Sequence, residues 1–178
     1  MHLTIKIPER ELRDVMPSER ELAQAAGRGV SNIVKRHLVE RDRRGRSDGL
    51  PRTGYYGDAA SGVTTEMDGK TALITIHKEG VALHYYGGVV YPTSGHKALA
   101  IPKSIQGAGK RPAEADPDHT KFALVWPKGK TTGTLRDKET DEVVYLLVPK
   151  ATIPEDKSIL PTESEMESAG MAAMEAIL

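Results

Sequence analysis

The chain has 178 residues, of which 38% are hydrophobic, so it suits one domain with one modest core. Its formal net charge is zero, which gives no general attraction to nucleic acid or to an acidic membrane surface. It contains no cysteine, and this excludes disulfides, thiolate metal sites and cysteine nucleophiles.

The first 17 residues begin with a strand pattern. Leu3, Ile5 and Ile7 alternate with polar residues, and Pro8 ends the run. The segment has neither the cationic lead nor the apolar stretch of a signal peptide, and no run in the chain approaches the ~20 apolar residues of a membrane span. We therefore expect no membrane partner, and we expect residues 1–17 to form an extra strand or an arm.

A long helix is predicted next. Ser18 and Glu21, after Pro17, have the spacing of a capping box. Apolar residues then recur at intervals of three and four, which predicts one buried face: Leu22, Ala25, Ala26, Val30, Ile33, Val34 and Leu38. The cationic last turns suit the helix C-terminal dipole, and Gly45 can end the helix.

Charge is unevenly distributed along the chain. Residues 35–46 hold six basic and two acidic residues, whereas residues 155–178 hold six acidic residues and one lysine. The basic cluster includes Arg41, Arg43, Arg44 and Arg46. A solvated helix end is the ordinary interpretation of such a cluster, and contact with DNA or with an acidic partner is the functional one.

The middle of the chain predicts a turn and short helix over residues 50–63, followed by strands. Strands are expected at 71–77, 81–90, 98–101, 122–126, 132–135 and 143–148, with the last two joined as a hairpin. The pair Gly87–Gly88 interrupts the second of these strands and suggests a bulge or a close backbone approach.

The segment from residue 102 to 119 is a long loop rich in proline and glycine, of a length that is usually functional or disordered. Thr162 and Glu165 form a second capping box, which opens a C-terminal helix with Met166, Ala169, Ala173 and Ile177 on one face. The order of elements predicts an α+β fold: a mainly antiparallel sheet, a long helix in the N-terminal half, and a C-terminal helix packed on it.

The candidate catalytic and metal-binding patterns in the sequence fail on spacing or context. His77 and His84 could meet across a hairpin and bind a metal, but strand-surface histidines explain them better. The stretch 107–110 lacks the full spacing of a phosphate-binding loop. Asp116 and Asp118 lie in a proline-rich turn, where aspartate is favoured for local hydrogen bonding. We therefore expect no catalytic residue, no metal, no cofactor and no enzyme activity.

Two segments resemble the virion morphogenesis family, the tail-completion and neck or minor tail components of Mu-like and lambda-like tailed phages. Pro51-x-Thr53-Gly54-x-Tyr56, followed by Ala60 and Val63, is similar to a "P-x-T-G-x-L" turn and to an "R-T-x-F/Y-x-x-A-A" stretch. Residues 80–92 look like the family's "G-I-A-x-x-H/R-x-F/Y-G-G-x-I-x-P" strand, and 97–102 match "K-x-L-x-I-P". Residues 144–148, a Leu160-Pro161 turn and the acidic terminal helix resemble its ending.

The resemblance covers most of residues 20–178. It departs at Tyr56, where the lambda-like pattern has an aliphatic residue, and at residues 3–15, which have no counterpart. It implies one tail-completion or neck-type domain that forms a ring, six-fold in the family, at the head–tail neck or tail end. The chain would be made in the bacterial host cytoplasm and reside in the virion, beside other neck or tail proteins and a possible DNA passage.

A ring subunit needs edges that pair with the next copy. Residues 81–90 and the arm at 3–7 are candidates for strand addition between subunits. The predicted subunit-interface residues are Leu3, Ile5, Tyr55, Tyr56, Tyr85, Tyr86, Gly87, Gly88 and Tyr91. Packing within the monomer explains the tyrosines about as well. Two other function classes stay open at this point: a DNA-contacting assembly factor and a small cell-wall hydrolase.

Overall fold

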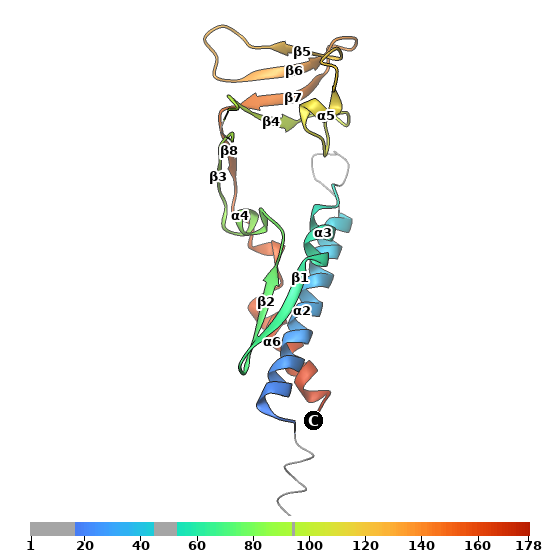
Figure 1. Cartoon of the computed structure of the whole chain (residues 1–178), viewed down its shortest axis with the longest axis vertical. Helices are drawn as coiled ribbons and strands as arrows, with labels where there is room; N and C mark the ends of the chain where they lie inside the picture. The colour runs from blue at the N-terminus through green and yellow to red at the C-terminus, as the bar shows by residue number, and fades with distance from the viewer. Residues whose placement is uncertain (1–16, 45–52, 94) are drawn as a thin grey trace, which may run out of the picture. The chain divides into compact units, whose positions relative to one another are not determined.

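The computed structural model describes residues 17–44, 53–93 and 95–178, which fall into two compact units (Figure 1). The first unit comprises residues 17–40, Tyr56–Lys78 and Leu160–Leu178. The second comprises residues 41–44 and 53–55 together with Glu79–Ile159. In the described part of the chain, no helix combines the length and apolar character that crossing a membrane requires.

The long helix α2 (Glu19–Arg44) begins at the predicted capping box. The Ser18 backbone N–H donates to Glu21 Oε2 at 2.8 Å, and the Glu21 N–H donates back to Ser18 Oγ at 3.3 Å. Two N–H groups that the first helical turn leaves without partners are satisfied in this way. The predicted helix start is confirmed, whereas its predicted end at Gly45 lies outside the described residues.

Helix α2 buries several of its residues in the first unit. The predicted apolar face is confirmed: Ala25, Val34 and Leu38 are buried, Leu38 completely. The small residues Gly27 and Ser31 lie on the same stripe as Val34 and Leu38, at i, i+4, i+7 and i+11, and apolar periodicity does not reveal them. A Cβ at Gly27 would lie 2.5 Å from the Ala72 Cβ, closer than two carbon atoms can approach, so at this point α2 packs against a β hairpin with no room for a side chain.

That hairpin consists of β1 (Val63–Asp68) and β2 (Thr71–Ile76), which pair in antiparallel register from Val63↔Ile76 to Asp68↔Thr71. It follows α3 (Tyr55–Ser61), the predicted short helix, which is confirmed. Strand β2 was predicted and β1 was not. Gly69, with φ of 59°, supplies the left-handed backbone that the tight turn between them requires.

The C-terminal helix α6 (Glu163–Glu175) packs against α2 within the same unit, as Figure 1 shows. Its capping box is confirmed: the Thr162 N–H donates to Glu165 Oε2 at 2.8 Å and the Glu165 N–H to Thr162 Oγ1 at 3.3 Å. Ala169 and Ala173 face Gly29 of α2. Ile177, predicted on the buried face, lies beyond the end of α6 and is 43% exposed.

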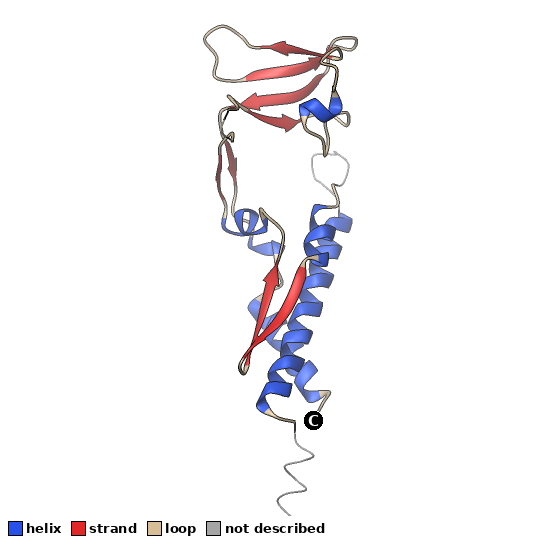
Figure 2. Ribbon diagram, in the orientation of Figure 1, coloured by secondary structure: helices blue, strands red, loops and turns tan. Residues whose placement is uncertain are grey.

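The second unit contains a four-stranded antiparallel sheet, in which each strand pairs only with its immediate neighbours. Its strand order is β4 (Leu99–Pro102), β7 (Val143–Val148), β6 (Gly133–Asp137) and β5 (Phe122–Val125). The four predicted strands in these regions are confirmed, as is the β6–β7 hairpin. A smaller ribbon pairs β3 (Gly88–Val90) with β8 (Ala151–Ile153), and β8 was not predicted (Figure 2).

The core of the second unit forms around Tyr145, whose side chain is fully buried against Phe122 and Val144. The Tyr145 hydroxyl donates to the carbonyl oxygens of Gly107 and Lys110, at 3.3 and 3.2 Å. These two hydrogen bonds attach the middle of the long loop predicted at 102–119 to strand β7 of the four-stranded sheet. Part of that loop is helical, because residues Pro112–Ala115 form the short helix α5.

The prediction of a strand over residues 81–90 is wrong in its first part. Val81–Tyr86 forms the short helix α4, and only Gly88–Val90 is extended. Glycines with positive φ lie on either side of α4, Gly80 at 86° and Gly87 at 71°, and they allow the chain to enter and leave one helical turn abruptly. Helix α4 packs against the 3-10 helix η1 (Lys157–Ile159), and the Asp156 N–H donates to the His84 carbonyl at 3.0 Å.

The predicted fold class is confirmed: the chain is α+β, its strand pairs are antiparallel, and it has the long helix and the C-terminal helix.

Candidate interaction surfaces

The tyrosines predicted at subunit interfaces differ in what they contact. Tyr55 is used inside the second unit: its hydroxyl donates to the Glu79 carbonyl at 2.6 Å, and its ring lies 5.7 Å from the His84 ring. Tyr56 is half-buried at the start of the first unit's α3 segment. Packing within the monomer therefore accounts for Tyr55.

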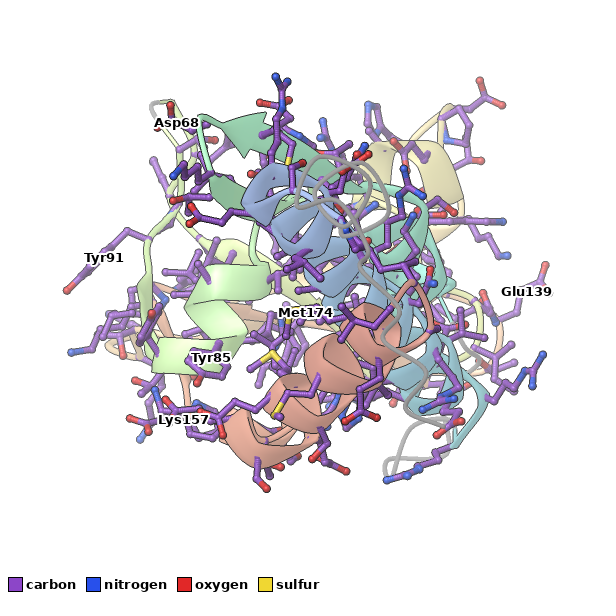
Figure 3. The ribbon with its side chains drawn as sticks, turned by 90° about the horizontal axis from the view of Figure 1, so that it is seen from below. Asp68, Tyr85, Tyr91, Glu139, Lys157 and Met174 are labelled. Atoms are coloured by element: carbon purple, nitrogen blue, oxygen red, sulfur yellow. The ribbon has the colours of Figure 1, made fainter. Side chains whose placement is uncertain are left out.

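Tyr85 and Tyr86 form a small surface cluster with Lys157. The two rings meet edge to face with centroids 4.9 Å apart, and the Lys157 ammonium lies 4.0 Å from the Tyr85 centroid and 4.4 Å from that of Tyr86 (Figure 3). Cation–π attraction holds the lysine there and orders the two rings. Tyr86 nevertheless remains 67% exposed.

The ribbon that follows α4 exposes further apolar surface. Gly87 fits closely against the backbone of Ile153 and Glu155, which leaves no room for a side chain, and Gly88 contacts Leu83. This is the close backbone approach that the glycine pair predicts. Beyond it, Val89 is 45% exposed and Tyr91 is 64% exposed, and Tyr91 points away from the ribbon in Figure 3.

The arginines of the basic cluster differ in what they contact. Arg41 forms an ion pair with Asp156, and its guanidinium also donates to Ser158 Oγ at 2.9 Å. Arg43 and Arg44 are exposed, and Arg46 lies outside the described residues, as do Leu3 and Ile5 of the predicted arm. The acidic partner of Arg41 is thus found inside the same unit rather than on a neighbouring subunit.

Buried carboxylates in the second unit organise turns. Asp116 accepts hydrogen bonds from the backbone N–H groups of Thr120, Lys121 and Phe122 at 2.9–3.2 Å. Burial alone raises the pKa of the Asp116 carboxyl, but these donated bonds outweigh it and hold the pKa below its ordinary value. Asp137 is similar: bonds from the Glu139 and Thr140 N–H groups lower its pKa.

The idea of a metal bound by His77 and His84 across a hairpin loses its basis. His84 lies on α4 rather than on a strand, and His77 is hydrogen-bonded to Thr64 Oγ1 at 3.0 Å. Among residues 17–44, 53–93 and 95–178, no three histidine or carboxylate side chains are grouped so as to hold a metal ion.

The outer edge of β5 is a candidate interaction surface that the sequence did not indicate. Lys138 N–H donates to the Lys121 carbonyl at 3.0 Å, so the Lys121 carbonyl and the backbone groups of Ala123 and Val125 face β6. By the same alternation the backbone groups of Leu124 face away from β6, and continuing it one residue past the end of β5 turns those of Trp126 the same way. Their side chains are 63% and 41% exposed.

The opposite edge of the sheet, at β4, is protected against pairing with another strand. Lys103 N–H donates to the Val144 carbonyl at 2.8 Å, so the alternation along β4 turns Ala100 and Pro102 outward. Proline has no N–H to offer, and proline on an edge strand is a common protection against strand pairing. Within the described residues, β5 is therefore the one of the sheet's two edges, seen in Figure 2, that is open to an added strand.

Comparisons of the chain with protein-family models, with curated proteins and with solved structures found no match. The exposed apolar surfaces described above are therefore interpreted from their geometry and from the sequence.

Proposed function

We propose that this chain is a structural virion protein of a tailed phage or prophage, which forms a ring at the head–tail neck or tail end. It acts as a tail-completion, terminator or connector subunit by joining copies of itself and docking on neighbouring rings. The resemblance of residues 51–63 and 80–102 to that family suggested this function. The single observation that best supports an assembly role is the open apolar edge of β5.

This edge has the properties of a contact surface between subunits. An exposed strand edge offers unpaired backbone groups, and monomeric proteins usually block such edges with proline, charge or a covering element. Among the described residues, β4 carries an outward proline and β5 has none, while Leu124 and Trp126 add apolar area beside the outward backbone groups of β5. A closed ring needs two different patches on each subunit, because head-to-tail contacts about a rotation axis are heterologous.

The second unit offers a further patch. Tyr86, Val89 and Tyr91 are all exposed on α4 and the ribbon that follows it, and exposed tyrosines are enriched at protein interfaces. Tyr86 and Tyr91 were predicted as candidate contacts and remain so, although α4 replaces the expected strand, and Val89 is an addition from the structure. The surface for strand addition moves from residues 81–90 to β5.

Contact with DNA is less well supported. Of the four arginines proposed for it, Arg41 is engaged with Asp156 and Ser158, and Arg43 and Arg44 are the described members left exposed. Two exposed arginines on a neutral chain give a weak electrostatic footprint for phosphate binding.

Native mass spectrometry tests whether the β5 edge supports assembly. We expect the wild-type protein to form oligomers. The Leu124→Lys variant should need at least a tenfold higher protein concentration to form them, because lysine on an edge strand blocks strand pairing. Leu73→Lys, at a 49%-exposed site on the β1–β2 hairpin, is the matched control and should assemble like wild type. Equal assembly of both variants would remove β5 from the interface.

A further inference from the structure

We propose that residues 3–7 of a second copy add as an antiparallel strand to the outer edge of β5. The inference rests on the proposed ring assembly and deepens it, because it names the segment and the edge that meet. It gives the ring one of the heterologous contacts that closure requires.

The open part of the edge is short and defined. It runs from Phe122 to Trp126, and outward backbone groups lie at Leu124 and Trp126. At Phe122 the outward N–H is already donated to Asp116 Oδ2 at 2.9 Å, and the Lys121 N–H also goes to Asp116. The run that an incoming strand can pair with therefore stops at Phe122.

The sequence of the arm matches this run in length and pattern. With Ile5 opposite Leu124, antiparallel pairing places Leu3 opposite Trp126 and Ile7 opposite Phe122. These apolar side chains would then extend the sheet face on which Leu124 is aligned with Leu135 and Tyr145. Pro8, which has no N–H to donate, falls just past Phe122, where Asp116 already uses the N–H groups of β5.

Charge favours the arm over a second β5 strand as the occupant. In the same register, Glu9 falls opposite Thr120, beside Lys121 and near Lys138, both of which are exposed. Pairing of two β5 edges with each other would instead bring Lys121 close to Lys128 of the other copy, which opposes like charges.

The arm also has the length to reach another subunit. Nine residues, 8–16, join the pairing segment to the described part of the chain, and at ~3.3 Å per residue they can span about 30 Å when extended. Strand addition of this kind draws its affinity from main-chain hydrogen bonds and its specificity from alternate side chains.

Cysteine crosslinking tests the pairing directly, because the chain has no cysteine of its own. We would mix full-length Ile5→Cys protein with full-length Leu124→Cys protein and oxidise the mixture. The expected result is a crosslinked dimer containing one chain of each kind. Thr4→Cys mixed with Leu124→Cys is the matched control, and it should crosslink at least tenfold less, since adjacent residues of a strand point to opposite faces.

Each other outcome overturns the inference. Crosslinking only when Ile5→Cys and Leu124→Cys are in the same chain would mean that β5 takes its own arm. Equal crosslinking from Thr4→Cys would mean that no ordered strand forms. Oligomers in native mass spectrometry without an Ile5–Leu124 crosslink would refute strand addition and leave the proposed ring intact, whereas monomers alone would refute both.

Discussion

Single buried polar groups hold the irregular parts of the second unit in place. Asp116 collects three consecutive backbone N–H groups at the entry to β5, and Tyr145 ties the loop carbonyls of Gly107 and Lys110 to the sheet. A buried polar group that lost such partners would cost free energy. These two residues explain why a loop rich in proline and glycine is ordered, although its composition indicated a flexible segment.

The Asp116 carboxylate makes the stability of the unit depend on pH. Its pKa is lowered on folding, so the stabilisation is fully present above the ordinary carboxyl pKa of ~3.9 and is lost as the pH falls through the lower pKa of the folded state. We expect Asp116→Asn to lower the free energy of unfolding at pH 7, and the difference from wild type to shrink as the pH approaches 3. Urea unfolding at both pH values measures this. A difference that does not change with pH would contradict the assigned role.

Helix packing in the first unit depends on glycine at one position and merely tolerates it at another. At Gly29 of α2 a Cβ would overlap the Ala169 carbonyl oxygen and lie 2.8 Å from the Ala173 Cβ. At Gly170 of α6 the nearest atom would be the Val30 side chain at 3.5 Å, an ordinary van der Waals contact. The two glycines therefore predict opposite effects of the same substitution.

We expect Gly29→Ala to lower the free energy of unfolding, because overpacking costs roughly 1–3 kcal/mol and exceeds the gain of about 1 kcal/mol in helix propensity. Gly170→Ala should raise it by up to about 1 kcal/mol, since it gains propensity without a clash. Chemical denaturation of the two variants beside wild type checks this. A stabilised Gly29→Ala protein would mean that α6 is not packed closely on α2.

Much of the element pattern could be predicted from the sequence, because the signals are local. Both capping boxes, at Ser18 and Thr162, and the apolar spacing of α2 and α6 act within one or two turns. Strand β1 was missed although Asp68-Gly69 is a strong hairpin signal, and the short β8 was missed because its partner β3 is distant in sequence. Helix α4 was taken for a strand, since aromatic residues suggested one and the terminating role of Gly80 and Gly87 depends on tertiary packing.

The candidate interaction surface at β5 could also be predicted only in part from the sequence. Residues 122–126 were predicted as a strand, but an unbroken apolar run is typical of a buried central strand. That Leu124 and Trp126 lie at an exposed edge follows from strand order, which is a property of the whole sheet. The tyrosines at 85, 86 and 91 were identified from composition, and the structure leaves Tyr86 and Tyr91 exposed.

At the scale of the whole molecule, the proposal combines one open strand edge, one exposed tyrosine patch and an N-terminal segment with strand character. Each is a modest feature alone. Together they give a subunit two different surfaces and a connecting arm, which is what head-to-tail assembly into a closed ring requires. The neutral net charge makes apolar contact and backbone pairing, rather than bulk electrostatics, the expected source of affinity.

Electron microscopy of the purified full-length protein tests the ring most directly. Particles would be imaged alone at low salt, and again after mixing with candidate neck or tail proteins. We expect closed rings of identical subunits, which the Leu124→Lys substitution disrupts and the Leu73→Lys substitution leaves intact. Uniform monomers under all of these conditions, or open filaments and irregular aggregates in place of rings, would contradict the proposed ring.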